Sequence, residues 1–474
     1  MAPAGEVSSV TQLPESALQV VPASPHVASL RGNSIARLVA DLLGIVFALV
    51  AATVTARLLG PAGKGYYSSL VLLTGLFVQL FSAGLGEAAI VLSGRGRASL
   101  QGAASATAFA VVPLSVAGAL LFFLIARFFV PTPTGDPSIA PVFAALMVGV
   151  IVLYTTSVSF LVAKERLVPV AAASVLSNGA TTVLVWLFLA VFHLGAAGAL
   201  LAAVLGSGSA LLVTLVLIRR SGLSLRPQWD ASYLKRATRF GAALQFSNLL
   251  VLLTARIDLV LVYRLSTAAE AGSYSIALTV GSLVGAVPIA ISYASFPRLS
   301  LLGEREAGAL TAQVFRVGIA SALVAAAGLA VVTPFAVPIV FGQPYAGAVG
   351  PTLLLIPGGV LWSAQWLLCR AAAARGAPAA LLVSFAVGFS IMVSLDLVLI
   401  PPLGAMGAAL ASLVAPCVGV TIAWLFHRKL TPGWRVFVPR ASDFVSFVAT
   451  IRGMVGRVGG RSSGVETTSP QKGD

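Results

Sequence analysis

The residues best suited to chemistry in this chain are polar groups inside an apolar segment near its middle. Gln245, Asn248 and Arg256 fall within about 80° of one another on a helix of 3.6 residues per turn. A charge at membrane depth costs about 2.5–3.5 kcal/mol, so this stripe must face protein or water. A guanidinium offers planar donors that match phosphate oxygens, which makes the stripe a candidate for binding an anionic substrate. The alternative is a hydrogen-bonded seam between two helix bundles.

Further charges inside apolar segments suggest gating or ion coupling. Asp258 points away from Arg256 on an ideal helix, so the two do not form a simple pair within one helix. Arg37 and Asp41 are four residues apart on one helix face, and form either an intrahelical ion pair or a gate; Arg37 is also a cavity candidate. Glu87 is interfacial, or pairs with Arg37 or Arg95, or is a carboxylate that couples to protons.

Few other residues indicate chemistry. Asp396 is expected to cap or pack a helix near the membrane interface. His26, His193 and His427 lie at or outside the ends of apolar segments without metal-ligand spacing, and the two cysteines lie in apolar runs. The sequence contains no phosphate-binding loop or nucleophile motif, and its loops are short. We therefore expect no metal, no cofactor and no enzymatic activity.

The elements that carry these residues are predicted to be membrane-spanning helices. Of the 474 residues, 58% are hydrophobic and only 9% are charged, with a mean hydropathy of +0.98. Water-soluble domains are about 25% charged. A spanning helix needs about 20 mostly apolar residues, and barrel strands are shorter and alternate. The sequence thus predicts an all-α polytopic membrane protein with twelve spans, at 35–58, 67–91, 103–127, 140–163, 168–192, 195–218, 240–263, 272–295, 314–340, 350–373, 378–400 and 404–427.

The basic residues favour one orientation. With a cytoplasmic N-terminus, the inside segments contain 25 of the 30 Lys and Arg, the outside segments four, and Arg256 lies within a span. This distribution follows the positive-inside rule and predicts that both termini are cytoplasmic. The net charge of +15 then reflects topology and attraction to membrane lipids, and does not indicate nucleic-acid binding.

Two sequence blocks recur at nearly the same offset. Leu194–Val204 resembles Leu403–Val414, and GYYSSL at 65–70 resembles GSYSIAL at 272–278. The repeat predicts two parallel six-helix bundles. The expected organisation is a disordered cytoplasmic tail 1–32, a first bundle 33–218, a basic cytoplasmic linker 219–239, a second bundle 240–427, and a basic tail 428–474 with an amphipathic helix 441–458 that binds lipid or a partner.

Four segments carry a family resemblance. They are ARLLGPAGKGYYS (Ala56–Ser68), ARIDLVLVYRLSTAAEAGSYSIAL (Ala255–Leu278), ISYASFPRLS (Ile291–Ser300) and LVLIPPLGAMGAALAS (Leu397–Ser412). Their order and spacing resemble the polysaccharide-transport (Wzx-type oligosaccharide-lipid flippase) family of the multidrug/oligosaccharidyl-lipid/polysaccharide exporter superfamily. The resemblance implies two bundles that form a V around a central cavity, with alternating access. It also places a basic–x–Asp pattern at Arg256 and Asp258.

The resemblance implies a flippase for a lipid-linked oligosaccharide or polysaccharide precursor in the bacterial cytoplasmic membrane. A polysaccharide polymerase or assembly protein is then an expected partner. The leading alternative is a cation-coupled multidrug exporter of the same superfamily, for which acidic cavity residues would be expected. A non-transporting scaffold or a sugar polymerase is a second alternative, which the duplicated halves and short loops disfavour.

Overall fold

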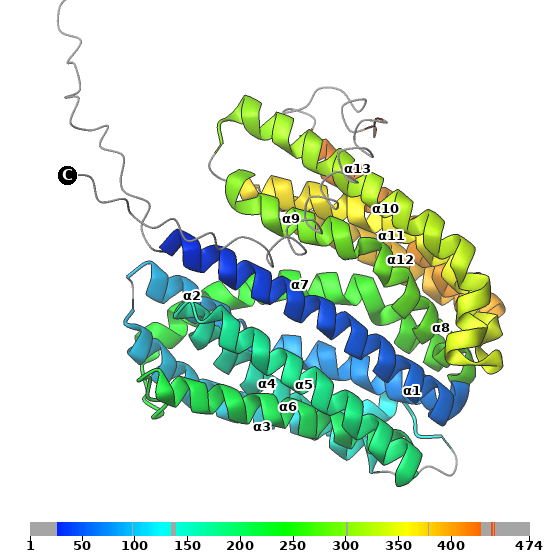
Figure 1. Cartoon of the computed structure of the whole chain (residues 1–474), viewed down its shortest axis with the longest axis horizontal. Coiled ribbons are helices and arrows are strands. Elements are labelled where there is room, and N and C mark those ends of the chain that lie inside the picture. Colours follow the sequence, from blue (N-terminus) through cyan, green and yellow to red (C-terminus); the bar gives the residue numbers. More distant parts are fainter. Residues whose placement is uncertain are drawn as a thin grey trace, which may run out of the picture.

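The computed structural model describes residues 26–96, 98–133, 139–299, 302–377 and 379–427, with Val438 and Arg440. Every regular element in these ranges is a helix, which confirms the all-α prediction (Figure 1). The first helix begins at His26, within the tail 1–32 that was expected to be disordered. The amphipathic helix predicted at 441–458 lies outside the described residues, as does nearly all of the tail 428–474.

Eleven helices in the described ranges are long and apolar enough to cross a membrane, so the chain is a multi-pass membrane protein. In chain order the elements are α1 (His26–Ser82), α2 (Leu85–Gly94), α3 (Leu100–Phe129), α4 (Ala140–Ala163), α5 (Leu167–Trp186) with a π-helical turn η2 (Leu187–Val191), α6 (Gly195–Arg220), α7 (Ala231–Leu265), α8 (Ala268–Gly281), a 3₁₀ turn η3 (Ser282–Gly285), α9 (Ala286–Leu299), α10 (Glu304–Phe341), a 3₁₀ turn η4 (Gln343–Ala348), α11 (Val349–Ala374), α12 (Ala379–Leu403) and α13 (Ala405–His427).

Helix α1 consists of two limbs that meet at Gly60. Its apolar part, Leu42–Ser82, has 41 residues. At 1.5 Å per residue it is about 62 Å long, twice the roughly 30 Å of a bilayer core. Gly60 has φ 67° and ψ 175°, a conformation that glycine alone adopts readily, and Pro61 then starts the second limb. The break agrees with the two separate spans predicted at 35–58 and 67–91.

Three predicted spans contain breaks that the sequence analysis missed. The span 67–91 is divided at Ala83 and Gly84, which have φ of 48° and 63°. The span 168–192 ends in the π-helical turn η2, and the span 272–295 is interrupted by η3. Apolar composition continues through all three breaks, so hydropathy alone does not register them. Irregular backbone at membrane depth is tolerated where neighbouring groups or a cavity satisfy it.

The helices pack in two groups that are joined through α1, α7 and α8. Helices α3–α6 contact α1, while α9–α13 contact one another (Figure 1). The first turns of α7 pack on α2 and α3, where Tyr233, Leu234 and Ala237 join an apolar cluster. Later turns of α7 contact α12 and α13. Helix α7 therefore belongs to the first group at its start and to the second group at its end.

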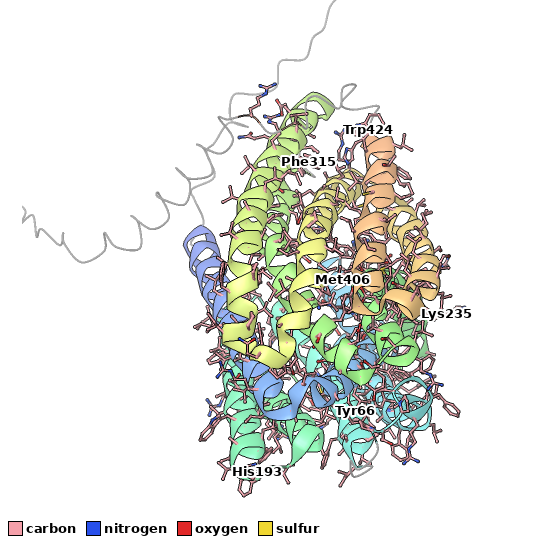
Figure 2. All side chains as sticks on the ribbon, turned by 90° about the vertical axis from the view of Figure 1, so that its right-hand side faces the viewer. Tyr66, His193, Lys235, Phe315, Met406 and Trp424 are labelled. Carbon is pink, nitrogen blue, oxygen red and sulfur yellow. The ribbon has the colours of Figure 1, made fainter. Side chains whose placement is uncertain are left out.

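Opposite ends of the molecule are marked by labelled side chains in Figure 2. Tyr66 and His193 lie at one end, and Phe315 and Trp424 lie at the other. We call the first of these the Gly60 end, because both limbs of α1 meet there. The other is the Gly84 end, since the 22 residues from Pro61 to Ser82 separate the two breaks by about 33 Å, one bilayer core.

Candidate functional site

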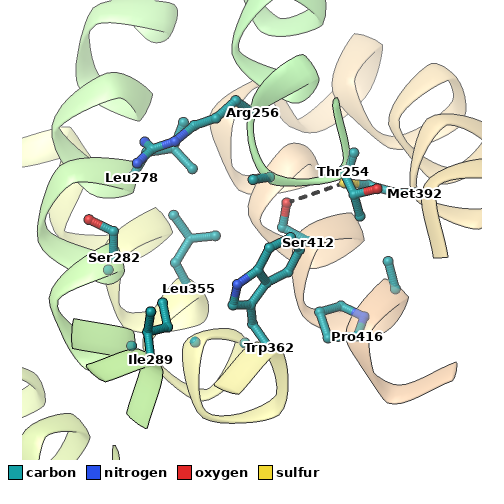
Figure 3. Close-up of a pocket in the computed structure, with 16 residues that line it drawn as sticks. Thr254, Arg256, Leu278, Ser282, Ile289, Leu355, Trp362, Met392, Ser412 and Pro416 are labelled. Carbon is teal, nitrogen blue, oxygen red and sulfur yellow. Dashed lines mark hydrogen bonds between the residues drawn. The ribbon is translucent and has the colours of Figure 1, made fainter. Parts of the chain in front are cut away.

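A cavity of about 250 Å³ lies inside the second group of helices. Helices α7, α8, α11, α12 and α13 line it, together with η3 and the start of α9. Its walls are mostly apolar, with Trp362 and Met392 on opposite sides of Ser412 (Figure 3). Four glycines, Gly281, Gly285, Gly358 and Gly359, keep the backbone close to the space. The cavity therefore has the apolar walls and few polar groups that are typical of ligand pockets.

Arg256 is the only charged residue among the described residues that line this cavity. Its side chain extends from α7 toward Leu278 and Ser282 (Figure 3). In the described part of the chain, no carboxylate forms an ion pair with it, although Asp258 and Tyr274 interact with it electrostatically. A guanidinium without an ion-pair partner can offer two parallel N–H donors to a phosphate or carboxylate.

Asp258 lies on the other side of α7 and is fully buried. Its Oδ2 accepts hydrogen bonds from the Tyr274 hydroxyl at 2.5 Å and from the Ser412 hydroxyl at 2.7 Å. Its Oδ1 accepts a hydrogen bond from the backbone N–H of Leu259 at 2.8 Å. Ser412 also lines the cavity, so its hydroxyl links this carboxyl to the space that Arg256 faces.

Asp396 of α12 is buried beside Asp258. Of the two roles expected for it, this position agrees with a helix-packing contact and not with an interfacial cap. Its side chain is 0% exposed, and neither carboxyl oxygen has a hydrogen-bond partner among the described residues. The two carboxyls are close enough to interact electrostatically. Two negative charges in a buried site repel each other strongly. A proton or a small cation held between Asp258 and Asp396 would relieve this repulsion. The sequence shows only how far Asp396 lies from the end of its span, and this distance does not indicate which way its side chain faces.

The polar stripe on α7 divides between two environments. Gln245 is 5% exposed, and its Nε2 donates a hydrogen bond to Gln79 Oε1 of α1 at 2.5 Å. Asn248 is half-buried and does not line the cavity. Gln245 therefore lies in a seam between α1 and α7, the alternative considered for the stripe, whereas Arg256 faces the cavity.

The remaining predicted residues lie away from the cavity or outside the described side chains. Glu87 is half-buried in the first turn of α2, directly after the break at Gly84. A carboxylate is favoured there by the helix dipole. Arg37 and Asp41 belong to the early turns of α1, where only the backbone is described. The structure therefore places Arg256 on the cavity wall, Asp258 behind that wall beside Ser412, and Glu87 away from both.

Two pairs of glycines hold the helix groups together at opposite ends. At the Gly60 end, a Cβ on Gly65 would lie 2.8 Å from the backbone N of Gly272 and closer still to Ala268 O. At the Gly84 end, a Cβ on Gly84 would lie 2.6 Å from Gly241 Cα. Real Cβ atoms do not come within 3.0 Å, so neither pair tolerates a side chain. Gly65 and Gly272 occupy equivalent places in the two repeat blocks, a signal that could have identified this contact.

Polar contacts reinforce the Gly60 end. Arg57 of α1 donates from Nε to Val340 O at 2.9 Å and from Nη2 to Ile339 O at 2.5 Å, at the last turn of α10. The Tyr345 hydroxyl of η4 donates to Ala56 O at 2.9 Å. The first limb of α1 is therefore fastened to the second group of helices at this end.

A protein-family model described as "Polysaccharide biosynthesis protein" matches residues 54–350. This stretch is more than half of the chain, and it includes Arg256, Asp258 and both repeat-equivalent glycines. No curated protein sequence matches the chain.

Solved structures of similar architecture cover most of the chain. A structure of the lipid II flippase MurJ in an inward closed conformation is 12% identical, with a TM-score of 0.68 over 91% of this chain and 94% of that chain. An inward-facing multidrug resistance MATE family transporter of the MOP superfamily is 15% identical, with a TM-score of 0.66 over 84% and 99%. A variant of the Vibrio cholerae MATE transporter VcmN is 16% identical, with a TM-score of 0.60 over 86% and 98%. At these identities the likeness establishes the fold alone.

Proposed function

Because the chain belongs to the polysaccharide biosynthesis protein family, a transporter family of the MOP superfamily and not a family of enzymes, we propose that it is a flippase for a lipid-linked oligosaccharide or polysaccharide precursor. The proposed route is alternating access across the bacterial cytoplasmic membrane. Membership of this family agrees with the resemblance found in the sequence. A polysaccharide polymerase or assembly protein would receive the product on the outer side.

In the proposed architecture, two parallel six-helix repeats form twelve crossings, with the two limbs of α1 counted separately. Both termini and the connection between α6 and α7 are cytoplasmic in this proposal, which makes the Gly60 end external. The fastened contacts at the Gly60 end then close the outer side. The paired glycines at the Gly84 end would separate and close in the opposite phase of the cycle.

The observation that carries this proposal is the cavity in which Arg256 is the only charged lining residue among those described. A precursor linked through pyrophosphate presents phosphate oxygens, for which Arg has a matching planar fork. The apolar and glycine-rich walls would accept the less polar part of the same molecule. Gln245, Asn248 and Arg37 remain secondary candidates for substrate contact along the path.

The arrangement of charge favours an anionic substrate over a cationic drug. Multidrug transporters of the MATE family share the fold, and a cation would bind best to acids on the cavity wall. Here Asp258 and Asp396 are both 0% exposed and absent from the cavity lining, while Arg256 is present in it. We therefore rank export of cationic drugs second.

The buried acid pair is the proposed site of ion coupling. The Ser412 hydroxyl donates a hydrogen bond to Asp258 Oδ2 at 2.7 Å. Binding or release of a proton or a small monovalent cation at Asp258 and Asp396 would strengthen or weaken this hydrogen bond. Because Ser412 also lines the cavity, the change would reach the substrate side directly. Asp41 and Glu87 remain proposed gating residues on the first group of helices.

Transport measurements on purified protein in vesicles test the substrate site. We expect Arg256→Ala to abolish translocation of a fluorescent lipid-linked oligosaccharide at a normal protein level, and Arg256→Lys to restore it only in part, since Lys lacks the bidentate geometry. Arg264→Ala is the matched control, because Arg264 is an exposed residue eight positions later on the same helix. Unchanged transport by Arg256→Ala would remove this residue from the site.

Imposed ion gradients test the coupling site separately. We expect Asp258→Asn and Asp396→Asn each to make translocation independent of a proton or sodium gradient, while the substrate still binds. Glu165→Gln removes an exposed acid from the turn between α4 and α5 and should leave the gradient dependence intact. If both Asn variants respond to the gradients as the unaltered protein does, the acid pair is structural.

A further inference from the structure

The connection between α6 and α7 runs along the outside of α3 for two helical turns. The Gln101 side chain forms two hydrogen bonds with the backbone of Ser224, to its N–H at 3.0 Å and to its carbonyl at 2.6 Å. One turn further along α3, the Ser105 carbonyl accepts from the N–H of Gln228 at 3.2 Å. The connection is therefore held in a defined position on the side of a membrane-spanning helix.

An exposed aromatic pair ends this path. Trp229 is 68% exposed and meets Phe109, which is 41% exposed, in an edge-to-face contact with 5.3 Å between ring centroids. Phe109 lies one turn beyond Ser105 on α3. Exposed Trp residues of membrane proteins concentrate at the boundary between headgroups and hydrocarbon, where one side of the ring is apolar and the other polar.

Six exposed basic residues flank Trp229 in the sequence. They are Arg219, Arg220, Arg226, Lys235, Arg236 and Arg239. Asp230 is the only acid between 219 and 239, and it is engaged as the N-cap of α7. Its Oδ1 accepts hydrogen bonds from the N–H of Tyr233 at 2.9 Å and from the Ser232 hydroxyl at 2.8 Å. The basic charge of the segment is therefore not neutralised within it.

The length of α7 places its first turns in the headgroup layer. The helix has 35 residues and is about 52 Å long, against roughly 30 Å for the hydrocarbon core. Tyr233, Leu234 and Ala237 belong to the apolar cluster that α7 forms with α2 and α3, so this face is occupied. Lys235 and Arg239 remain on the exposed face of the same turns.

We propose that residues 219–239 and Phe109 form a binding surface for anionic phospholipids, the linker surface. The six cations contact lipid phosphates, and Trp229 with Phe109 inserts at the headgroup boundary. The occupant is a phospholipid because the aromatic pair lies on the third turn of a spanning helix, where exposed aromatic side chains meet lipid. This surface is separate from the cavity that Arg256 lines, and its test does not depend on transport.

A local fluorescence measurement tests the linker surface. In protein that carries Cys417→Ser, a bimane label at Gln228→Cys reports lipid contact beside Trp229. Spin-labelled phosphatidylglycerol in phosphatidylcholine vesicles should quench the label more than spin-labelled phosphatidylcholine does. Each basic residue near a membrane surface contributes about 1 kcal/mol, so Lys235→Gln with Arg239→Gln should lower the relative association of phosphatidylglycerol roughly 30-fold.

The matched control removes two exposed basic residues from the opposite end of the molecule, with Arg127→Gln and Arg264→Gln. These changes should leave the quenching at residue 228 as it was. Equal quenching by both lipids in the unaltered protein would overturn the proposal. An equal loss of selectivity in the control pair would also overturn it, because the effect would then come from net charge and not from this surface.

Discussion

The contact between Gly65 and Gly272 makes a quantitative prediction about closure of the Gly60 end. A Cβ on Gly65 would lie 2.8 Å from the Gly272 N and 3.0 Å from the Ala268 carbonyl carbon, and closer still to its oxygen. These are backbone atoms, so only a movement of α8 away from α1 can relieve the clash. Overpacking of this kind costs about 1–3 kcal/mol, and the cost applies only when this end is closed. The equilibrium between closed and open forms should therefore shift toward the open form by about 5- to 150-fold.

Spin labels across the Gly60 end measure this shift. Leu58 and Ile339 are 48% and 70% exposed, and Arg57 binds the Ile339 carbonyl, so labels at these positions report the separation of α1 and α10. In a Cys417→Ser background, Gly65→Ala should add or enlarge a population with a longer distance, and Gly272→Ala should do the same. Helix content measured by circular dichroism should be unchanged.

Gly347→Ala is the matched control, because Gly347 lies in η4 at the same end and a Cβ there would have no neighbour within 4 Å. A Gly65→Ala distribution identical to that of Gly347→Ala would refute the reasoning, since the closed form would then tolerate the side chain. Loss of helix content in Gly65→Ala alone would also contradict it, by showing that the contact is needed for folding and not only for closure.

Three further predictions concern polar contacts. Arg57→Ala removes two hydrogen bonds to the last turn of α10 and should lengthen the same label distance, whereas Arg264→Ala should not. Glu270→Ala removes the acceptor for the N–H of Ala405, 2.6 Å away at the start of α13, and should lower the free energy of unfolding by about 1–3 kcal/mol in thermal melts, with the exposed Glu165→Ala as control. The hydrogen bond from the Tyr233 N–H lowers the pKa of Asp230. The capped start of α7 should therefore be fully formed at any pH above the ordinary pKa of an aspartate, and it should fray only as the pH falls through the lowered pKa. Hydrogen exchange at Tyr233 that shows no such dependence would contradict this last expectation.

The sequence predicted the helices well and the interruptions poorly. Length and hydropathy placed α4 at 140–163, as observed, because a bilayer requires a long apolar run whatever surrounds it. The turn η3 and the break at Ala83 keep the same apolar composition, so tertiary contacts alone decide their geometry. The wheel on α7 correctly separates Arg256 from Asp258, but it cannot show that Gln245 meets Gln79 from another helix.

Asp396 illustrates the other limit of sequence reasoning. Its partner Asp258 is 138 positions away, and the two meet only because α7 and α12 pack together. The local sequence of neither residue points to the other. A buried acid and an interfacial acid have the same local sequence signal here, and only the fold distinguishes them.

The start of α7 has a consequence for dividing this protein into separately expressed halves. A cut in the connection 221–230, the obvious boundary between the repeats, would leave Tyr233, Leu234 and Ala237 on the second fragment. These side chains complete an apolar cluster with Leu85 and Phe160 of the first half. The first fragment would then expose that cluster until its partner arrived. A cut after residue 241 would instead divide α7 itself. Neither boundary therefore yields two halves that fold independently, because the start of α7 packs on the first group of helices and its later turns pack on the second.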